Sequence, residues 1–248
     1  MSFRLPTTEE KADYVLAQFN RIAKGYDLAN DVISMGMHHL WKKKAINALK
    51  IKPEGQYLDV CCGTGDLTIR IAGCLSVAGG VTGLDFAANM LELAKTRLEK
   101  ERNKPTSQQI CTTVSFMQGD AQSLPFPENH FDGAVNSFGL RNLTNIDKGL
   151  AEMERVVKPG GKVVNLDLGQ PSNWLFTPFY YFYFRRIVPI IGQFLQKDKN
   201  AYTYLPRSLD TYASPEAISN LFKKANLTNI EYIPLAFGSV ALHVGTKF

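Results

Sequence analysis

Polar residues that could bind a small molecule recur in the first two thirds of the chain, each shortly after a short apolar run. Carboxylates, hydroxyls and backbone N–H groups in such positions can bind a polar ligand through several hydrogen bonds at once. In chain order they are Asp59 with the loop residues Gly63, Thr64 and Gly65, then Asp85, then Asp120 with Ala121, and finally Ser137.

The glycine loop indicates which nucleotide this site would bind. A dinucleotide-binding loop would place a third glycine at position 68, after Gly63 and Gly65, but that residue is Thr68. An acidic residue, Asp59, precedes the loop instead, and it could face an ammonium group. Backbone N–H groups around Thr64 could face a carboxylate. This pattern favours S-adenosylmethionine, whose amino-acid end carries both charges.

The remaining polar residues fit the rest of that molecule. Asp85 can accept hydrogen bonds from both ribose hydroxyls, and Asp120 can accept one from the adenine amino group while the Ala121 N–H donates to a ring nitrogen. Ser137 would lie near the centre of the cofactor. One such aspartate alone is more often a helix cap, but the order and spacing of the set favour a binding site.

The elements that must position these residues alternate along the chain. We predict strands at residues 57–61, 81–84, 114–117, 133–137 and 162–168, with helices at 66–72, 89–100 and 147–156. Such alternation indicates a parallel sheet with helices on both faces, and ligands bind at the carboxyl ends of its strands.

The last part of the chain has a different pattern. A helix is predicted at residues 215–225, followed by strands at 230–234 and 240–246 whose short connection permits only antiparallel pairing. We therefore expect an α/β chain with the doubly wound, seven-stranded class I S-adenosylmethionine-dependent methyltransferase fold and an antiparallel terminal hairpin. Residues 1–248 would form a single domain, with a helical N-terminal cap at 1–50 and an aromatic insertion over the active site at 171–210.

Composition limits the partners. The net charge of +5 comes without any basic block, so we predict no nucleic-acid partner. The four cysteines form no metal-site spacing, and we predict no metal and reduced thiols in a cytoplasmic protein. The apolar stretch 174–195 contains Arg185 and Arg186 near its centre, which argues against a membrane span.

Several segments carry a resemblance to a known family. The chain resembles the ubiquinone/menaquinone biosynthesis C-methyltransferases over residues 15–247. The matching segments are residues 19–27 with Asn30, 34–38 with Trp41, 59–66, 119–121, 124–126, 138–142 and 241–247. Two departures are visible: Cys61 stands where the general methyltransferase loop has glycine, and Asp167 stands where glutamate is common.

This resemblance implies C-methylation of a prenylated hydroquinone ring in menaquinone, phylloquinone or ubiquinone biosynthesis. A ring carbon becomes a good nucleophile when a neighbouring hydroxyl gives up its proton. Catalytic roles are therefore expected at Arg141 and Asn142, and at Tyr26 and Asp27. Arg141 would stabilise a phenolate, because a guanidinium stays charged, while water or Asp27 would carry the proton.

Alternatives remain open at this level. The chain could methylate another small lipophilic acceptor, or it could be a noncatalytic methyltransferase-fold partner in a quinone-biosynthesis complex. The intact Asp59, Gly63, Gly65, Asp85 and Asp120 argue against the noncatalytic role. We expect a prenylated quinol as substrate, and leave open a homodimer and a peripheral contact with the inner face of the membrane.

Overall fold

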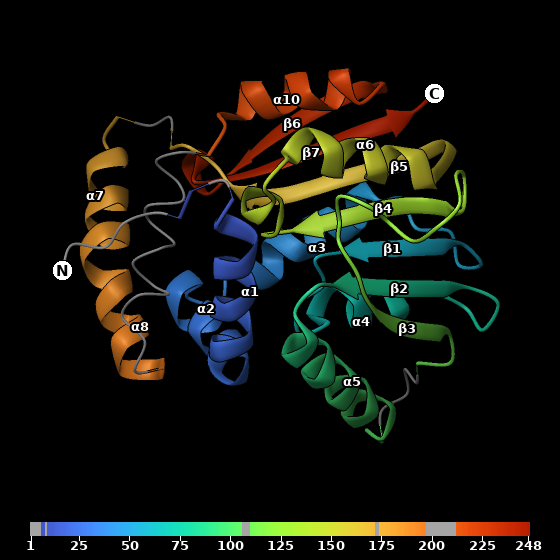
Figure 1. Ribbon diagram of the computed structural model, residues 1–248, viewed down its shortest axis with the longest axis horizontal. Coiled ribbons are helices and arrows are strands. Elements are labelled where there is room, and N and C mark those ends of the chain that lie inside the picture. The colour runs from blue at the N-terminus through green and yellow to red at the C-terminus, as the bar shows by residue number, and fades with distance from the viewer. Residues whose placement is uncertain (1–5, 8, 106–109, 172–173, 197–211) are drawn as a thin grey trace.

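The structure is a computed structural model that describes residues 6–7, 9–105, 110–171, 174–196 and 212–248 (Figure 1). Within the aromatic insertion predicted at 171–210, residues 172–173 and 197–210 lie outside the described residues.

A seven-stranded sheet forms the centre of the molecule, in the order β3-β2-β1-β4-β5-β7-β6. The first five strands are parallel, and β7 is antiparallel to both β5 and β6. This arrangement confirms the predicted fold class. The strands are β1 (Gln56–Val60), β2 (Gly80–Asp85), β3 (Thr113–Gln118), β4 (Phe131–Ser137), β5 (Val157–Leu168), β6 (Leu227–Leu235) and β7 (Val240–Lys247).

Side chains of the central strands alternate between two cores, because neighbouring residues of a strand point to opposite faces of the sheet. In β1, Tyr57 belongs to the core beneath α3 and α4, whereas Leu58 belongs to the core beneath α6 and α10. The helices that cover the two faces are α3 (His38–Ala48), α4 (Asp66–Ala72), α5 (Ala88–Arg102), α6 (Ile146–Val156) and α10 (Pro215–Lys224).

The N-terminal cap predicted at residues 1–50 consists of α1 (Lys11–Ile22), the 3-10 turn η1 (Ala23–Gly25), α2 (Tyr26–Ser34) and α3. Helix α2 contacts α8 (Val188–Gln196), which follows α7 (Thr177–Phe182) and the π-helical turn η3 (Tyr183–Ile187). Figure 1 shows α1 and α2 between the sheet and α7–α8, on the side of the sheet to which the parallel strands point. Among the described residues, no helix is both long and apolar enough to cross a membrane.

The start of β5 differs from the prediction, which placed it at residue 162. Helix α6 ends at Val156, and Val157 already pairs with Phe131 of β4. The chain becomes extended this early because the residue before Pro159 disfavours helical dihedrals. The pairing then resumes with Lys162 opposite Gly133, after a bulge that contains Gly160 in the left-handed region.

Candidate active site

The glycine loop that joins β1 to α4 has a strained backbone. Gly63 and Gly65 have φ of 54° and 75°, dihedrals that favour glycine. A Cβ on Gly63 would meet nothing within 4 Å, so its backbone is open to a ligand. Cys61 has φ of 58°, which explains why the related position is commonly glycine. All four cysteines are free.

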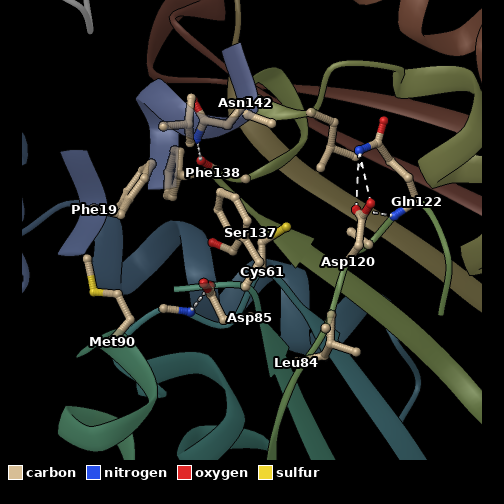
Figure 2. A pocket seen from close by; sticks show the side chains of 18 of the residues that line it. Phe19, Cys61, Leu84, Asp85, Met90, Asp120, Gln122, Ser137, Phe138 and Asn142 are labelled. Atoms are coloured by element: carbon tan, nitrogen blue, oxygen red, sulfur yellow. Dashed lines mark hydrogen bonds between the residues drawn. The ribbon is translucent and has the colours of Figure 1, made fainter. Parts of the chain in front are cut away.

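A first cavity, with an empty volume of about 770 Å³, lies at the carboxyl ends of β1, β2 and β4. Three of the predicted residues, Asp85, Asp120 and Ser137, lie around it (Figure 2). Gly63 and Ala121 also line it, and Phe19 of α1 forms part of the wall on the cap side. We call it the nucleoside cavity.

Asp85 is a buried carboxylate at the end of β2. It accepts hydrogen bonds from the backbone N–H of Gly63 at 2.8 Å and of Ala87 at 2.9 Å. Burial raises the pKa of Asp85, while these two N–H groups act in the opposite direction. Asp85 therefore holds the glycine loop against β2, and each of its oxygens has a second lone pair that could accept a ribose hydroxyl.

Asp120 lies in the turn after β3. Its carboxylate accepts from the backbone N–H of Gln122 at 2.8 Å and from the Gln122 side chain at 3.2 Å. The neighbouring Ala121 is buried. An aspartate that caps its own turn is held in a fixed orientation, which suits recognition of the edge of a base.

Asp59 is 1% exposed, and only one of its carboxylate oxygens has a partner, the Thr68 hydroxyl at 2.6 Å. The other oxygen, Oδ1, is buried with no hydrogen-bond partner among the described residues. Burial raises the pKa of Asp59 to about 7. An unpartnered buried carboxylate oxygen is costly unless a cation binds it. Thr68, whose presence excluded a dinucleotide loop, thus orients this carboxylate.

A second cavity, with an empty volume of about 1580 Å³, adjoins the first. We call it the acceptor cavity. Asp59 and Thr64 line it, with aromatic side chains from the cap and from η3, among them Trp41 and Phe184. Five residues line both cavities and mark their junction: Tyr26, Cys61, Gly63, Ser137 and Phe138. Ser137 Oγ is buried at this junction with no hydrogen-bond partner among the described residues.

Arg141 and Asn142 are neighbours in the chain but line different cavities. They belong to the 3-10 turn η2 (Leu140–Asn142), in which successive side chains point in different directions. Arg141 lines the acceptor cavity, and its Nη1 donates to Asp167 Oδ1 at 2.5 Å and to the Phe138 carbonyl at 2.7 Å. Asn142 lines the nucleoside cavity. The structure thus brings only Arg141 to the larger cavity.

Tyr26 and Asp27 also separate. Tyr26 lines both cavities and packs edge-to-face on Phe19, with ring centroids 5.9 Å apart. Asp27 lines neither cavity. Its carboxylate accepts from the Thr64 hydroxyl at 2.7 Å and from the guanidinium of Arg97 on α5.

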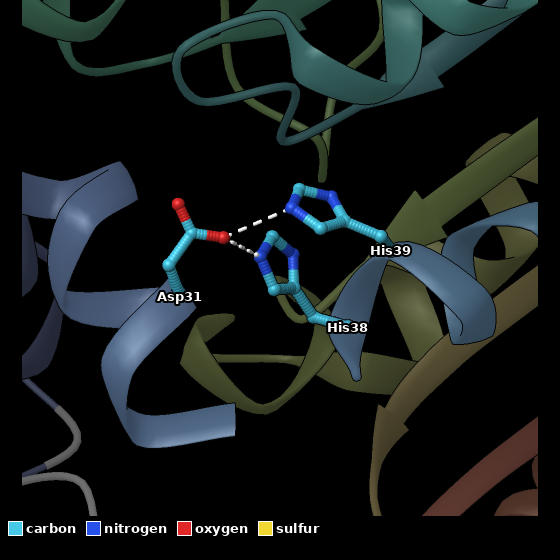
Figure 3. Close-up of side chains that lie close together, drawn as sticks. All are labelled: Asp31, His38 and His39. Carbon is cyan, nitrogen blue, oxygen red and sulfur yellow. Dashed lines mark hydrogen bonds and ion pairs between the residues drawn. The ribbon is translucent and has the colours of Figure 1, made fainter. Parts of the chain in front are cut away.

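Asp31, His38 and His39 gather where α2 meets α3, with ligand-type atoms within 4.8 Å of one another (Figure 3). Asp31 Oδ1 lies 2.8 Å and 2.9 Å from the Nε2 atoms of His38 and His39. The Arg70 guanidinium lies 2.7 Å from His39 Nδ1, and since it can only donate, the ring proton of His39 is on Nε2. The Nε2 atoms thus donate to Asp31 and are not available to a metal, so we interpret the cluster as a tie between the two helices.

The side chains fit S-adenosylmethionine. A carboxylate with a buried unpartnered oxygen lies on the acceptor side of the junction, and a second carboxylate ends β2 on the nucleoside side. Between them, the open backbone of Gly63 offers a close approach.

Some residues of this region carried no recognisable signal in the sequence. Lys42 lines the acceptor cavity and donates to Asp66 at 2.8 Å. It is the first of three consecutive lysines, a pattern typical of a solvent-exposed helix face. Arg97 likewise reads as an exposed charge on an amphipathic helix. The contacts of both depend on how α3 and α5 pack against the glycine loop, which periodicity does not reveal.

The chain is similar to known proteins along nearly its whole length. The model of the ubiE/COQ5 methyltransferase family matches residues 7–247. A demethylmenaquinone methyltransferase of Desulfitobacterium hafniense (strain Y51) is 40% identical over 239 residues, which cover 96% of this chain and 92% of the relative. Another of the same name, from Bacillus cereus (strain AH187), is 38% identical and covers 96% of this chain and 98% of the relative.

Solved structures share the fold. A methyltransferase dependent on S-adenosylmethionine from Aquifex aeolicus superposes with a TM-score of 0.59 at 15% identity, covering 84% of this chain and 89% of that one. One from Thermotoga maritima gives a TM-score of 0.61 at 18% identity, with coverage of 94% and 99%. Taken with the cavities and the family match, these findings identify the chain as an S-adenosylmethionine-dependent methyltransferase that belongs to the ubiE/COQ5 methyltransferase family.

Proposed function

We propose that the chain methylates a ring carbon of a prenylated hydroquinone, demethylmenaquinol, in menaquinone biosynthesis. Two of its relatives carry the name demethylmenaquinone methyltransferase at 40% and 38% identity. The observation that carries the proposal is the junction of the two cavities. A large cavity with eight aromatic side chains in its wall adjoins the cavity for the nucleoside at Tyr26, Ser137 and Phe138, as transfer of a methyl group to an apolar ring requires.

When bound, S-adenosylmethionine supplies an electrophilic methyl group. The chain must hold the acceptor ring at the junction and assist loss of a proton from the hydroxyl next to the reacting carbon. Arg141 stabilises the resulting phenolate through a charge-assisted hydrogen bond. Tyr26 covers the ring from the cap, and Asn142 holds the cofactor side. Since both oxygens of Asp27 accept from Thr64 and Arg97, water carries the proton.

The assignment is tested by incubating the protein with methyl-labelled S-adenosylmethionine and one of three acceptors. These are demethylmenaquinol, demethylphylloquinol and the ubiquinol precursor, each kept reduced. Label is expected in demethylmenaquinol, on a ring carbon. The oxidised quinone serves as a matched control and should take up none, because it has no hydroxyl to deprotonate. Label in none of the reduced acceptors would refute the quinol assignment.

The prenyl tail would leave the acceptor cavity beside an exposed apolar surface. Phe176 lines the cavity, and its ring lies 5.0 Å from that of Phe237, which is 66% exposed. Exposed apolar side chains occur on the cap, on α7–α8 and the residues just before α7, and on the turn before β7: Leu28, Met35, Leu40, Trp174, Phe179, Phe182, Ile190 and Phe237. We propose that this surface contacts the membrane that holds the substrate.

Vesicle flotation tests the membrane contact. Replacing Phe179 and Phe182 with serine should lower the vesicle-bound fraction about tenfold, because two large apolar side chains no longer enter the lipid. Val77→Ser, an apolar-to-serine change at an exposed position in the connection after α4, away from this surface, serves as control. Protein that stays wholly in solution would refute the contact. Dimers that dissociate in the double variant would show instead that the surface joins two copies of the chain.

A further inference from the structure

Three side chains from separate elements meet where the cap touches the glycine loop: Asp27 of α2, Thr64 of the loop and Arg97 of α5. Arg97 pairs with Asp27 through its Nη2. Its Nη1 donates to the Thr64 hydroxyl at 3.4 Å and lies 3.8 Å from Asp66 Oδ1. The Thr64 side chain therefore contacts both partners of the ion pair. We call this set the cap clamp.

The cap clamp adjoins the residues that form the junction of the two cavities. Asp27 follows Tyr26, which lines both cavities at their junction. Helix α2 also supplies Asn30 and Ile33 to the wall of the acceptor cavity. A bond that holds Asp27 to the loop therefore determines how close this wall lies to the junction.

Thr64 gives the clamp a second consequence. Its residue is 4% exposed, and it lies in the loop whose N–H groups are expected to face the cofactor carboxylate. A loop that is ordered by cofactor would present the Thr64 hydroxyl to Asp27 in one orientation. Thermodynamic linkage makes this coupling reciprocal. The free energy by which bound cofactor favours the ordered cap equals the free energy by which the ordered cap favours cofactor binding.

From these contacts we propose that Arg97 is a positioning residue, which locks α2 onto the glycine loop through Asp27 and thereby couples cofactor binding to formation of the acceptor cavity. The effect on acceptor binding rests on the proposed function. The coupling between loop and cap does not, because it involves only the cofactor site. Asp27 then acts through Tyr26 and Thr64 and does not touch the acceptor itself.

Hydrogen exchange tests the coupling without an acceptor. In the unchanged protein, S-adenosylhomocysteine should slow amide exchange in residues 26–34. In Arg97→Gln that protection should shrink about fivefold, the size expected for a partly exposed charge network of about 1 kcal/mol. Lys95→Gln, which removes a charge from an exposed position on the same helix, should leave the protection intact. Unchanged protection in Arg97→Gln would overturn the proposal.

Kinetics and a conservative variant provide the second readout. Arg97→Gln should raise KM for the acceptor about fivefold, with a smaller fall in kcat, because the cavity wall is displaced while the reacting groups remain. Arg97→Lys, which can still pair with Asp27, should recover part of the loss. Asp27→Asn combined with Arg97→Gln should be no worse than either change alone. Additive losses would overturn the clamp, whereas an unchanged protein that methylates no quinol would refute only the proposed function.

Discussion

The nucleoside cavity and the acceptor cavity meet at five residues, yet they are built from different kinds of structure. The polar residues of the nucleoside cavity follow strands β1, β2, β3 and β4, whose spacing is set by the hydrogen bonds of the sheet. The acceptor cavity takes a large part of its wall from the cap and from α7–η3, which pack through side chains. The first is therefore rigid by its backbone, and the second depends on contacts such as the cap clamp.

Substitutions on the two sides should consequently differ in what they change. A change at a strand end should impair cofactor binding whether or not an acceptor is present. A change in the acceptor wall should alter turnover and acceptor KM while the cofactor affinity stays constant. Measuring both quantities for each variant shows whether the division between the cavities is real.

The largest effect is expected for Asp85→Ala. The variant lacks the bonds to Gly63 and Ala87 that hold the loop, and it should also lose the two charge-assisted hydrogen bonds that we expect Asp85 to accept from the ribose. At about 1.5 kcal/mol or more for each ribose bond, affinity for S-adenosylhomocysteine should fall about 100-fold or more. Titration calorimetry measures it, and Asp120→Ala should show a smaller loss. Unchanged affinity for Asp85→Ala would refute the ribose contact.

A second, smaller effect should come from the acceptor side. Arg141→Lys retains the charge but loses the guanidinium geometry. We expect kcat to fall about 30-fold, less than for complete loss of one donor to a developing oxyanion, because the lysine ammonium can still donate. Affinity for S-adenosylhomocysteine should stay within about twofold of the unchanged value, because Arg141 does not line the nucleoside cavity.

Folding must be monitored in that experiment. Arg141 pairs with Asp167, which is 1% exposed, and complete removal of one partner from a buried pair costs about 3–5 kcal/mol. Lysine is chosen because it keeps a charge near Asp167. Arg102→Lys, on the outer part of α5, is the control for the effect of replacing an arginine with lysine away from the cavities. An equal loss of cofactor affinity and turnover would mean that the two cavities are not separable at this residue.

The same division explains what could be predicted from sequence. The strands and the residues that follow them were predictable because apolar runs, glycines and caps act locally. Asp59, Asp85, Asp120 and Ser137 all line the cavities as expected. The separation of Arg141 from Asn142 was not predictable, since it depends on the 3-10 turn. The pairing of Asp27 with Arg97 was not predictable either, because Arg97 lies 70 residues away in the sequence and reaches Asp27 only through the packing of α5.

A third effect, of about tenfold, follows from the pKa of Asp59. Burial raises this pKa to about 7 in the protein without cofactor, so the carboxyl is largely protonated at pH 6. We expect the cofactor ammonium to bind the ionised form, so that binding releases a proton below pH 7. Affinity for S-adenosylhomocysteine should therefore weaken about tenfold from pH 8 to pH 6, one pKa unit below 7.

The stability of the cofactor-free protein should show the opposite dependence. A carboxyl whose pKa is higher in the folded than in the unfolded protein binds more protons when folded, so the free energy of unfolding falls as pH rises from about 4 to 7. Asp59→Asn should abolish both the pH dependence of affinity in calorimetry and this part of the stability profile. If Asp59→Asn binds S-adenosylhomocysteine with the unchanged pH dependence, another group titrates. Residues other than those at the strand ends would then contribute to cofactor binding, and the contrast between the two cavities would be weaker.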